Sequence, residues 1–220
     1  MTAPLLDGPR LAPKSGGAAK QLIVFLHGYG ADGNDLIGIG DQWAEQMPDA
    51  AFVSPHAPEA CAMAPVGRQW FHLTLRDPSE YWRGVVAARP ALDAFLDAEL
   101  ARLGLTDKDM VLVGFSQGSM MAMHTGLRRK NPLAGIVAYS GLLAGPEHLQ
   151  AELTGKPPVF LAHGTHDEVV PFALMGAAES ALKAADVPVI SHAAQGMGHG
   201  IDGIGLATGL AHCQSVLKSN

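Results

Sequence analysis

Short apolar runs alternate along this chain with longer amphipathic segments. The apolar runs predict strands at residues 22–26, 51–53, 110–115, 134–139, 159–162 and 189–192. The amphipathic segments predict helices at residues 35–46, 80–103, 117–129, 171–185 and 201–218. Such alternation is typical of strand–helix–strand units around a parallel sheet, and the nearly continuous hydrophobicity of the strands indicates that helices cover both faces. The pattern therefore predicts an α/β fold with a mostly parallel central sheet.

Three stretches depart from this pattern. Residues 1–19 mix proline, glycine and charged side chains and predict an irregular N-terminal segment of a single domain that spans residues 1–220. Residues 54–78 form the longest stretch without clear periodicity, and a loop of that length in a compact domain is often functional. Pro90 lies inside the helix predicted at residues 80–103, where the lost backbone hydrogen bond should kink the helix or begin a new one.

Composition and charge indicate a compact domain and argue against several kinds of binding partner. With 48% hydrophobic and 16% charged residues in 220, the chain suits one compact domain. A net charge of -6 without a basic stripe argues against a nucleic-acid partner. The first 20 residues hold no continuous apolar stretch, so we expect no signal peptide and no membrane insertion, and the cytoplasm is the expected compartment. Cys61 and Cys213 form no metal spacing or disulfide framework, so we expect free thiols and no metal site.

The strand predicted at residues 110–115 runs into Gly114-Phe115-Ser116-Gln117-Gly118, and a helical pattern follows at once. This is the layout of a nucleophile elbow, a sharp strand-to-helix turn that exposes a serine hydroxyl above the sheet. The two glycines suit the turn because a Cβ at either position would collide with its neighbours. Ser116 is therefore the candidate nucleophile.

A serine needs a base to take its proton and an acid to orient that base. In folds with an elbow the order along the chain is serine, acid, histidine, each on a loop after a strand. Asp167 follows the strand at 159–162, and His199 lies in a glycine-flanked loop after the strand at 189–192. Glu168 is the alternative acid, while His163 and His166 precede the acid on its own loop and are interpreted as loop-shaping or hydrogen-bonding residues.

Serine hydrolases also hold the developing oxyanion with N–H donors. One donor should be the backbone N–H of Gln117, which follows the nucleophile at a helix N-terminus. The other should come from the loop after the strand at 22–26, where His27-Gly28-Tyr29-Gly30 has the glycines to bend toward Ser116. An ordinary strand-to-helix turn is an equally good interpretation of that tetrapeptide.

Four ordered segments, FLHGYGADGNDL, VGFSQGSMMAM, LAHGTHDEVVPF and GMGHGI, resemble the phospholipase/carboxylesterase family, which includes carboxylesterases and acyl-protein thioesterases. The resemblance covers nearly the whole chain from about residue 20. It implies an α/β-hydrolase fold without a large cap domain, and activity without a cofactor. It also implies Ser116, Asp167 and His199 as the triad, the amides of Leu26 and Gln117 as the oxyanion hole, and a possible weak homodimer.

The chain departs from the family in two places. Gly118 is followed by serine and two methionines where relatives often have a second glycine, and we expect Met120 and Met121 to be helix core. Gln69 stands where relatives tend to have a serine before Trp70. Trp70 lies in the loop expected to border the acyl groove, although it could instead anchor that loop. The expected substrate-binding residues are Met63, Trp70, Phe71, Leu73 and Val169.

The sequence therefore predicts a serine carboxylesterase that hydrolyses small-molecule esters of short to medium acyl chains through an acyl-enzyme intermediate. One alternative is an acyl-protein thioesterase or lysophospholipase that acts on long acyl chains, so that an acylated protein or lysolipid is the partner. A second alternative is a catalytically silent α/β-hydrolase that serves as a ligand-binding protein, although no member of the predicted triad is missing.

Overall fold

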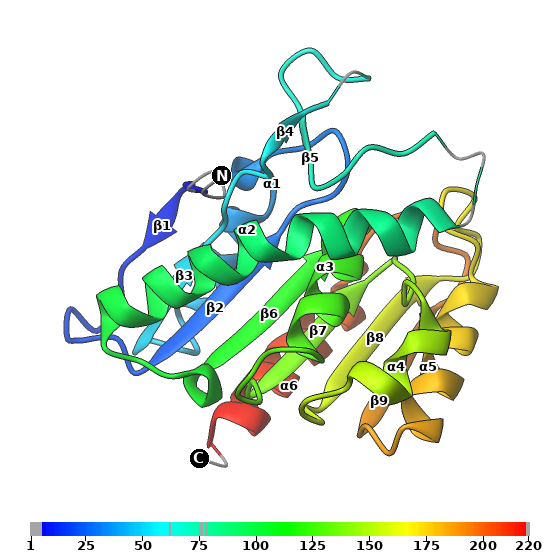
Figure 1. Ribbon diagram of the computed structural model, residues 1–220. Helices are drawn as coiled ribbons and strands as arrows, with labels where there is room; N and C mark the ends of the chain where they lie inside the picture. The colour runs from blue at the N-terminus through cyan, green and yellow to red at the C-terminus, as the bar shows by residue number, and fades with distance from the viewer. Residues whose placement is uncertain (1–5, 62, 75–76, 78, 219–220) are drawn as a thin grey trace.

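The computed structural model describes residues 6–61, 63–74, 77 and 79–218, and its centre is a seven-stranded sheet (Figure 1). The strand order is β1-β3-β2-β6-β7-β8-β9, and every neighbouring pair is parallel except β1 with β3. The strands of this sheet are β1 (Arg10–Leu11), β2 (Gln21–Leu26), β3 (Ala50–Val53), β6 (Met110–Phe115), β7 (Gly135–Tyr139), β8 (Val159–Gly164) and β9 (Val189–Ala194). The prediction of a mostly parallel sheet is confirmed.

Helices cover both faces of the sheet, each over its own apolar cluster. Helices α1 (Gly33–Trp43) and α6 (Gly203–Lys218) cover one face. The other face carries α2 (Ser79–Leu103), α3 (Gln117–Gly126), α4 (Leu149–Glu152) and α5 (Ala173–Ala184), which stand in front of the sheet in Figure 1. Two short 3-10 helices complete the chain, η1 (Asp107–Asp109) and η2 (Pro146–His148). This is the α/β-hydrolase fold, and the described residues form no cap domain.

Three short strands lie where the sequence predicted irregular chain. Strand β1 belongs to the N-terminal segment, and β4 (Glu59–Ala60) pairs with β5 (Arg68–Gln69) inside the long aperiodic stretch. Two-residue strands are too short to show a period of two in the sequence, so only their partners reveal them. Strand β1 is held by a side chain from far along the chain, since Arg10 Nη2 lies 2.8 Å from Oε1 of the buried Glu99.

Helix α2 continues through Pro90 as one element, so of the two expected outcomes, a kink or a new helix, the second is wrong. Proline removes the hydrogen bond to the carbonyl four residues earlier, which belongs to Val86. Val86 is 45% exposed, and water can reach that side of the helix. The missing bond therefore costs less there than on the face of α2 that packs on the sheet.

Strand β9 corrects the expectation that both faces of every strand are covered. It forms an edge of the sheet, and Ile190 in it is 54% exposed. A central strand and an edge strand can have the same apolar sequence pattern, so only the neighbouring strands show which of the two β9 is.

Among the described residues, no helix is long and apolar enough to cross a membrane.

The parallel strands end along a common edge of the sheet. The loops that follow β2, β6, β7, β8 and β9 therefore converge at the carboxyl ends of the strands, where open α/β sheets bind ligands. Helix α3 begins at this edge and is buried along its whole length between α2 and the sheet. The candidate chemistry described below lies on these loops.

Candidate active site

Ser116 occupies the turn between β6 and α3 in a strained backbone conformation. Its φ is 53° and its ψ is -119°, in a region that residues with a side chain rarely adopt. The turn is tight enough that a Cβ on Gly118 would clash with the carbonyl oxygen of Leu26, and one on Gly114 would clash with the carbonyl of Gly118. The glycine spacing in the sequence thus matches a real steric need at the elbow.

Two neighbours hold the backbone of Ser116. Its N–H donates to the carbonyl of Tyr139 at 2.9 Å, which ties the elbow to the end of β7. Its carbonyl accepts from the hydroxyl of Ser119, also at 2.9 Å. Strain of this kind persists only where the surroundings fix the backbone, as these two bonds do. Ser116 itself is 8% exposed, at the carboxyl edge of the sheet.

Asp167 and His199 meet although 31 residues separate them in the chain. His199 Nδ1 lies 2.7 Å from Asp167 Oδ2, and Asp167 Oδ1 accepts from the backbone N–H groups of Val169 at 2.9 Å and Val170 at 2.8 Å. Burial alone would raise the pKa of the Asp167 carboxyl. The hydrogen bonds from His199 and the two N–H groups outweigh burial and hold that pKa below its ordinary value. The carboxylate is therefore ionised and its orientation is fixed.

The contact with Asp167 also fixes the tautomer of His199. Since a carboxylate only accepts, the proton of neutral His199 lies on Nδ1, and Nε2 is left free to accept a proton. The imidazole ring packs against Phe115, the neighbour of Ser116, with ring centroids 4.9 Å apart. The hydroxyl of the buried Ser140 donates to the carbonyl of Gly200 at 2.8 Å and so braces the loop that carries His199.

The alternatives for the acid and the base lie elsewhere. Glu168 and His166 are exposed, and among the described residues the side chain that hydrogen-bonds to His199 is that of Asp167. His163 is buried, with Nε2 2.8 Å from the carbonyl oxygen of Val170 and 3.0 Å from Asp167 Oδ2. Its position under the carboxylate was not anticipated from the sequence, although it precedes the acid by only four residues.

Two backbone segments adjoin Ser116, the start of α3 and the loop after β2. Gln117 begins α3 directly after Ser116. On the other side, a Cβ on Gly28 would lie 3.4 Å from Ser116 Cβ, so the loop after β2 packs against the nucleophile. Leu26 is the last residue of β2, pairs with Gly114 and is fully buried. In the loop, the N–H of Gly30 is occupied by the carbonyl of Arg68 at 2.9 Å.

The side chain of Gln117 has a structural role that sequence reasoning missed. Its Oε1 accepts from the N–H of Trp70 at 2.8 Å, and its Nε2 donates to the carbonyl of Phe71 at 2.7 Å. The Trp70 indole donates in turn to the carbonyl of His27 at 3.0 Å. The loop that carries Trp70 and Phe71 is therefore hydrogen-bonded both to the elbow and to the loop after β2.

His27 completes this bracing and is uncharged. Its Nε2 accepts from the N–H of Ala57 at 3.0 Å, so the ring proton lies on Nδ1, 2.8 Å from the carbonyl of Gly28. Burial lowers the pKa of the His27 imidazole below its ordinary value, which matches this neutral form. A buried histidine that is tied to two backbone groups shapes the loop rather than moving protons.

The predicted substrate-binding residues divide into two groups. Trp70 and Phe71 are buried, so Trp70 anchors its loop as the alternative interpretation proposed, and Leu73 is partly buried against the core. Met63 and Val169 are instead 82% and 67% exposed. Met120 and Met121, the two methionines after the elbow, are at most 2% exposed, so the expectation that they belong to the core is confirmed.

A cleft of about 590 Å³ opens between α2, α5 and the loop after β7, and none of Ser116, Asp167 and His199 lines it. Its apolar lining includes Trp82, Leu142, Leu143 and Leu174. Gly141, just before this lining, packs against the carbonyl of Ser116. The sequence did not point to these residues, because their position in the cleft depends on the path of the loop after β7.

Among the described residues, no group of three or more histidine, cysteine or acidic side chains is placed to hold a metal ion. Both cysteines are free.

Comparison with known proteins gives concordant results. A family model described as phospholipase/carboxylesterase matches residues 12–217. The chain is 33% identical to acyl-protein thioesterase 1 of Saccharomyces cerevisiae over 77% of this chain and 79% of the relative, and 29% identical to esterase YpfH of Escherichia coli over 92% and 85%. The crystal structure of esterase PE8 superposes with a TM-score of 0.94 at 46% identity, over 97% of this chain and all of PE8.

Proposed function

Because the chain belongs to the phospholipase/carboxylesterase family of hydrolases, we propose that it is a serine carboxylesterase with Ser116, His199 and Asp167 as its catalytic triad. One observation carries the proposal: the buried Asp167 carboxylate holds Nδ1 of His199 at 2.7 Å, while the His199 ring packs on the residue before Ser116. This leaves Nε2 of His199 free to accept the proton of Ser116, which lies in a strained, glycine-flanked turn.

The reaction proceeds in two halves. In the first, His199 Nε2 takes the hydroxyl proton as Ser116 Oγ bonds to the ester carbonyl carbon, and Asp167 stabilises the imidazolium. The bond to the alcohol oxygen then breaks, and the alcohol leaves with the proton from His199. In the second half, water gives a proton to His199 and attacks the acyl carbonyl. The bond to Ser116 Oγ then breaks, His199 returns the proton to Oγ, and the carboxylic acid leaves.

Two backbone donors hold the oxyanion in this proposal. The N–H of Gln117 is one of them, at the positive end of α3. For the second donor, the family resemblance suggests Leu26. The N–H of Tyr29, in the loop that packs against Ser116, is an alternative because it makes no hydrogen bond within the described residues. Each such donor stabilises the transition state by about 2.7–4 kcal/mol.

The cleft between α2, α5 and the loop after β7 is the proposed site for the acyl chain. Its volume of about 590 Å³ lies within the range of sites for small ligands, and its wall is mainly apolar. Leu142 and Leu143 line it directly after Gly141, which touches the Ser116 backbone. In this proposal, the acyl chain of a substrate bound to Ser116 Oγ lies against these leucines.

Hydrolysis of p-nitrophenyl esters from acetate to palmitate tests the proposal, with wild type beside Ser116→Ala. We expect activity to peak at short or medium chains and to fall by at least about 10⁴-fold in Ser116→Ala. Ser191→Ala is the matched control, because Ser191 is exposed on β9 and its hydroxyl donates to the carboxylate of Glu179. Wild-type activity in Ser116→Ala would refute the proposal.

A second candidate is an acyl-protein thioesterase, and the names of the relatives favour it. Several relatives 30–33% identical to this chain are acyl-protein thioesterases from fungi. The two candidates differ in chain length and leaving group, so turnover of a palmitoyl-cysteine peptide should be compared with that of a butyrate ester. A higher kcat/KM for the palmitoyl peptide would favour the thioesterase.

A further inference from the structure

His163 lies directly beneath the Asp167 carboxylate, at the end of β8. Its side chain is 1% exposed, and its ring packs edge-on against Phe172 with centroids 6.1 Å apart. Nε2 lies 2.8 Å from the carbonyl oxygen of Val170 and 3.0 Å from Asp167 Oδ2. Both neighbours are acceptors, so Nε2 carries the ring proton of neutral His163, and the N–H donates to the Val170 carbonyl.

His163 and Asp167 thus form hydrogen bonds with the backbone of the same residue, Val170. The N–H of Val170 donates to Asp167 Oδ1 at 2.8 Å, and the carbonyl of Val170 accepts from His163. Each of the three residues, His163, Asp167 and Val170, therefore contacts the other two, because Nε2 of His163 also lies 3.0 Å from Oδ2 of Asp167. Oδ2 is the oxygen that holds His199.

We propose that His163 is a positioning residue for the reaction: it keeps Oδ2 of Asp167 directed at His199. This inference rests on the proposed function. The N–H of His163 fixes the Val170 carbonyl, and so fixes the amide that binds Oδ1. Nε2 of His163 also lies 3.0 Å from Oδ2 and so limits where that oxygen can move. His163 touches no reacting atom and acts only through Asp167.

The chemistry of the site calls for a donor at the position of Nε2. Without it, the buried Val170 carbonyl loses its partner and the loop that holds Asp167 loosens. The side-chain amide nitrogen of glutamine reaches the position of Nε2, whereas that of asparagine corresponds to Nδ1. His163→Gln should therefore keep the contact, while His163→Leu and His163→Asn should lose it.

The first test compares the three variants on p-nitrophenyl acetate. We expect kcat to fall by about 10- to 100-fold in His163→Leu and His163→Asn, with KM within about twofold of wild type, because a hydrogen bond beside a charged group is lost. His163→Gln should stay within about threefold of wild type. If His163→Leu does not fold, the contrast between glutamine and asparagine decides the question. Equal kcat in all the folded variants and wild type would overturn the proposal.

A double-mutant cycle with Asp167→Asn separates positioning from general packing. If His163 acts through the carboxylate, His163→Leu should change kcat by less than about twofold once Asp167 is already asparagine. A purely structural role would lower kcat by the same factor in both backgrounds, and that result would refute the proposal. Thermal midpoints of all four proteins show whether they remain folded at the assay temperature.

Failure of the positioning role can be distinguished from failure of the proposed function. If Ser116→Ala keeps wild-type activity, the proposed function fails, whatever His163 does. If Ser116→Ala is inactive and the two changes at His163 and Asp167 multiply, only the positioning role fails.

Discussion

At the scale of single residues, His124 makes stability depend on pH. It is buried in α3, and its Nδ1 has no hydrogen-bond partner among the residues that the structure describes. Burial, with help from Arg128 and Arg89, lowers the pKa of the imidazole from 6.5 to about 3. Between these values the unfolded chain binds a proton that the folded chain does not, so the free energy of unfolding should decrease as pH falls from about 6.5 to 3, by at most about 1.4 kcal/mol per pH unit.

Urea unfolding at pH 7 and pH 5 checks this prediction. His124→Gln, which cannot titrate, should lose less stability between the two pH values than wild type. The Trp82 ring lies edge-on to His124 at 5.3 Å and stacks on His148 at 4.0 Å. His148→Gln is therefore the matched control, because His148 is partly exposed. The interpretation is wrong if His124→Gln and wild type lose equal stability.

At the scale of elements, the elbow depends on the missing side chain of Gly118. An added Cβ would strike the carbonyls of Leu26 and His27, which are backbone atoms that cannot move aside cheaply. Gly118→Ala should therefore lower the free energy of unfolding by about 3 kcal/mol, as overpacking does, and should also displace Ser116 and abolish esterase activity. Equilibrium denaturation and p-nitrophenyl acetate turnover measure the two effects.

Gly176 in α5 is the matched helical glycine, since a Cβ there meets no atom within 4 Å. Gly176→Ala should raise the free energy of unfolding by about 0.5–1 kcal/mol, because alanine loses less conformational freedom than glycine in a helix. Activity should not change. A similar loss of stability in both alanine variants would show that packing at the elbow is not the cause.

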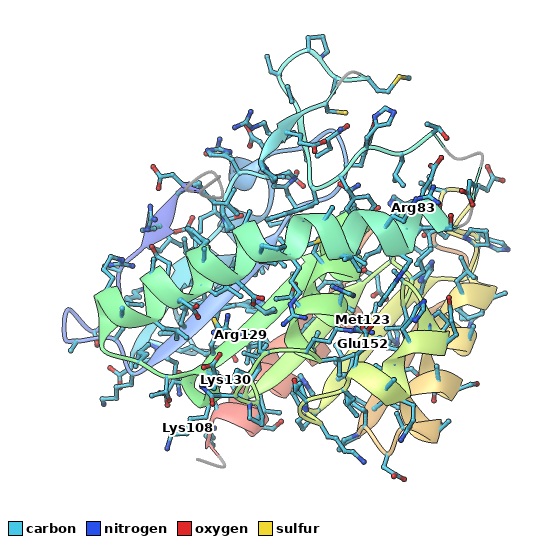
Figure 2. All side chains as sticks on the ribbon, in the orientation of Figure 1. Arg83, Lys108, Met123, Arg129, Lys130 and Glu152 are labelled. Atoms are coloured by element: carbon cyan, nitrogen blue, oxygen red, sulfur yellow. The ribbon has the colours of Figure 1, made fainter. Side chains whose placement is uncertain are left out.

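At the scale of the whole molecule, Arg129 (labelled in Figure 2) joins parts of the chain that the sheet alone does not connect. Its guanidinium reaches Asp93 at 3.0 Å and Asp97 at 2.6 Å on α2, and Asp107 at 2.5 Å on η1. Arg129 and Asp107 are each 7% exposed. Arg129→Leu leaves the Asp107 carboxylate buried without a cation, so the free energy of unfolding should fall by about 3–5 kcal/mol.

Denaturant midpoints of Arg129→Leu and Lys183→Met check this prediction together. Lys183 pairs with Glu179 on the exposed face of α5, and removing an exposed pair should cost less than about 1 kcal/mol. Similar losses in the two variants would show that burial of Asp107 does not matter.

The sequence by itself determined the order and type of the long elements. The strand predicted at residues 110–115 is β6 with the same bounds, and the helix predicted at 201–218 differs from α6 by two residues. Periodicity is local, and each of these segments is long enough to show it. The elbow around Ser116 was equally visible, because two glycines and a strand-to-helix change lie within eight residues.

Only the tertiary structure decided what depends on partners far along the chain. The sequence could not show that β9 forms an edge, that Arg10 holds β1 through Glu99, or that Trp70 is an anchor. In the site, it could order Asp167 before His199, but not show which carboxylate faces that ring or that His163 lies beneath it. Side-chain direction in a loop follows from hydrogen bonds to other strands and loops, and no local pattern encodes those bonds.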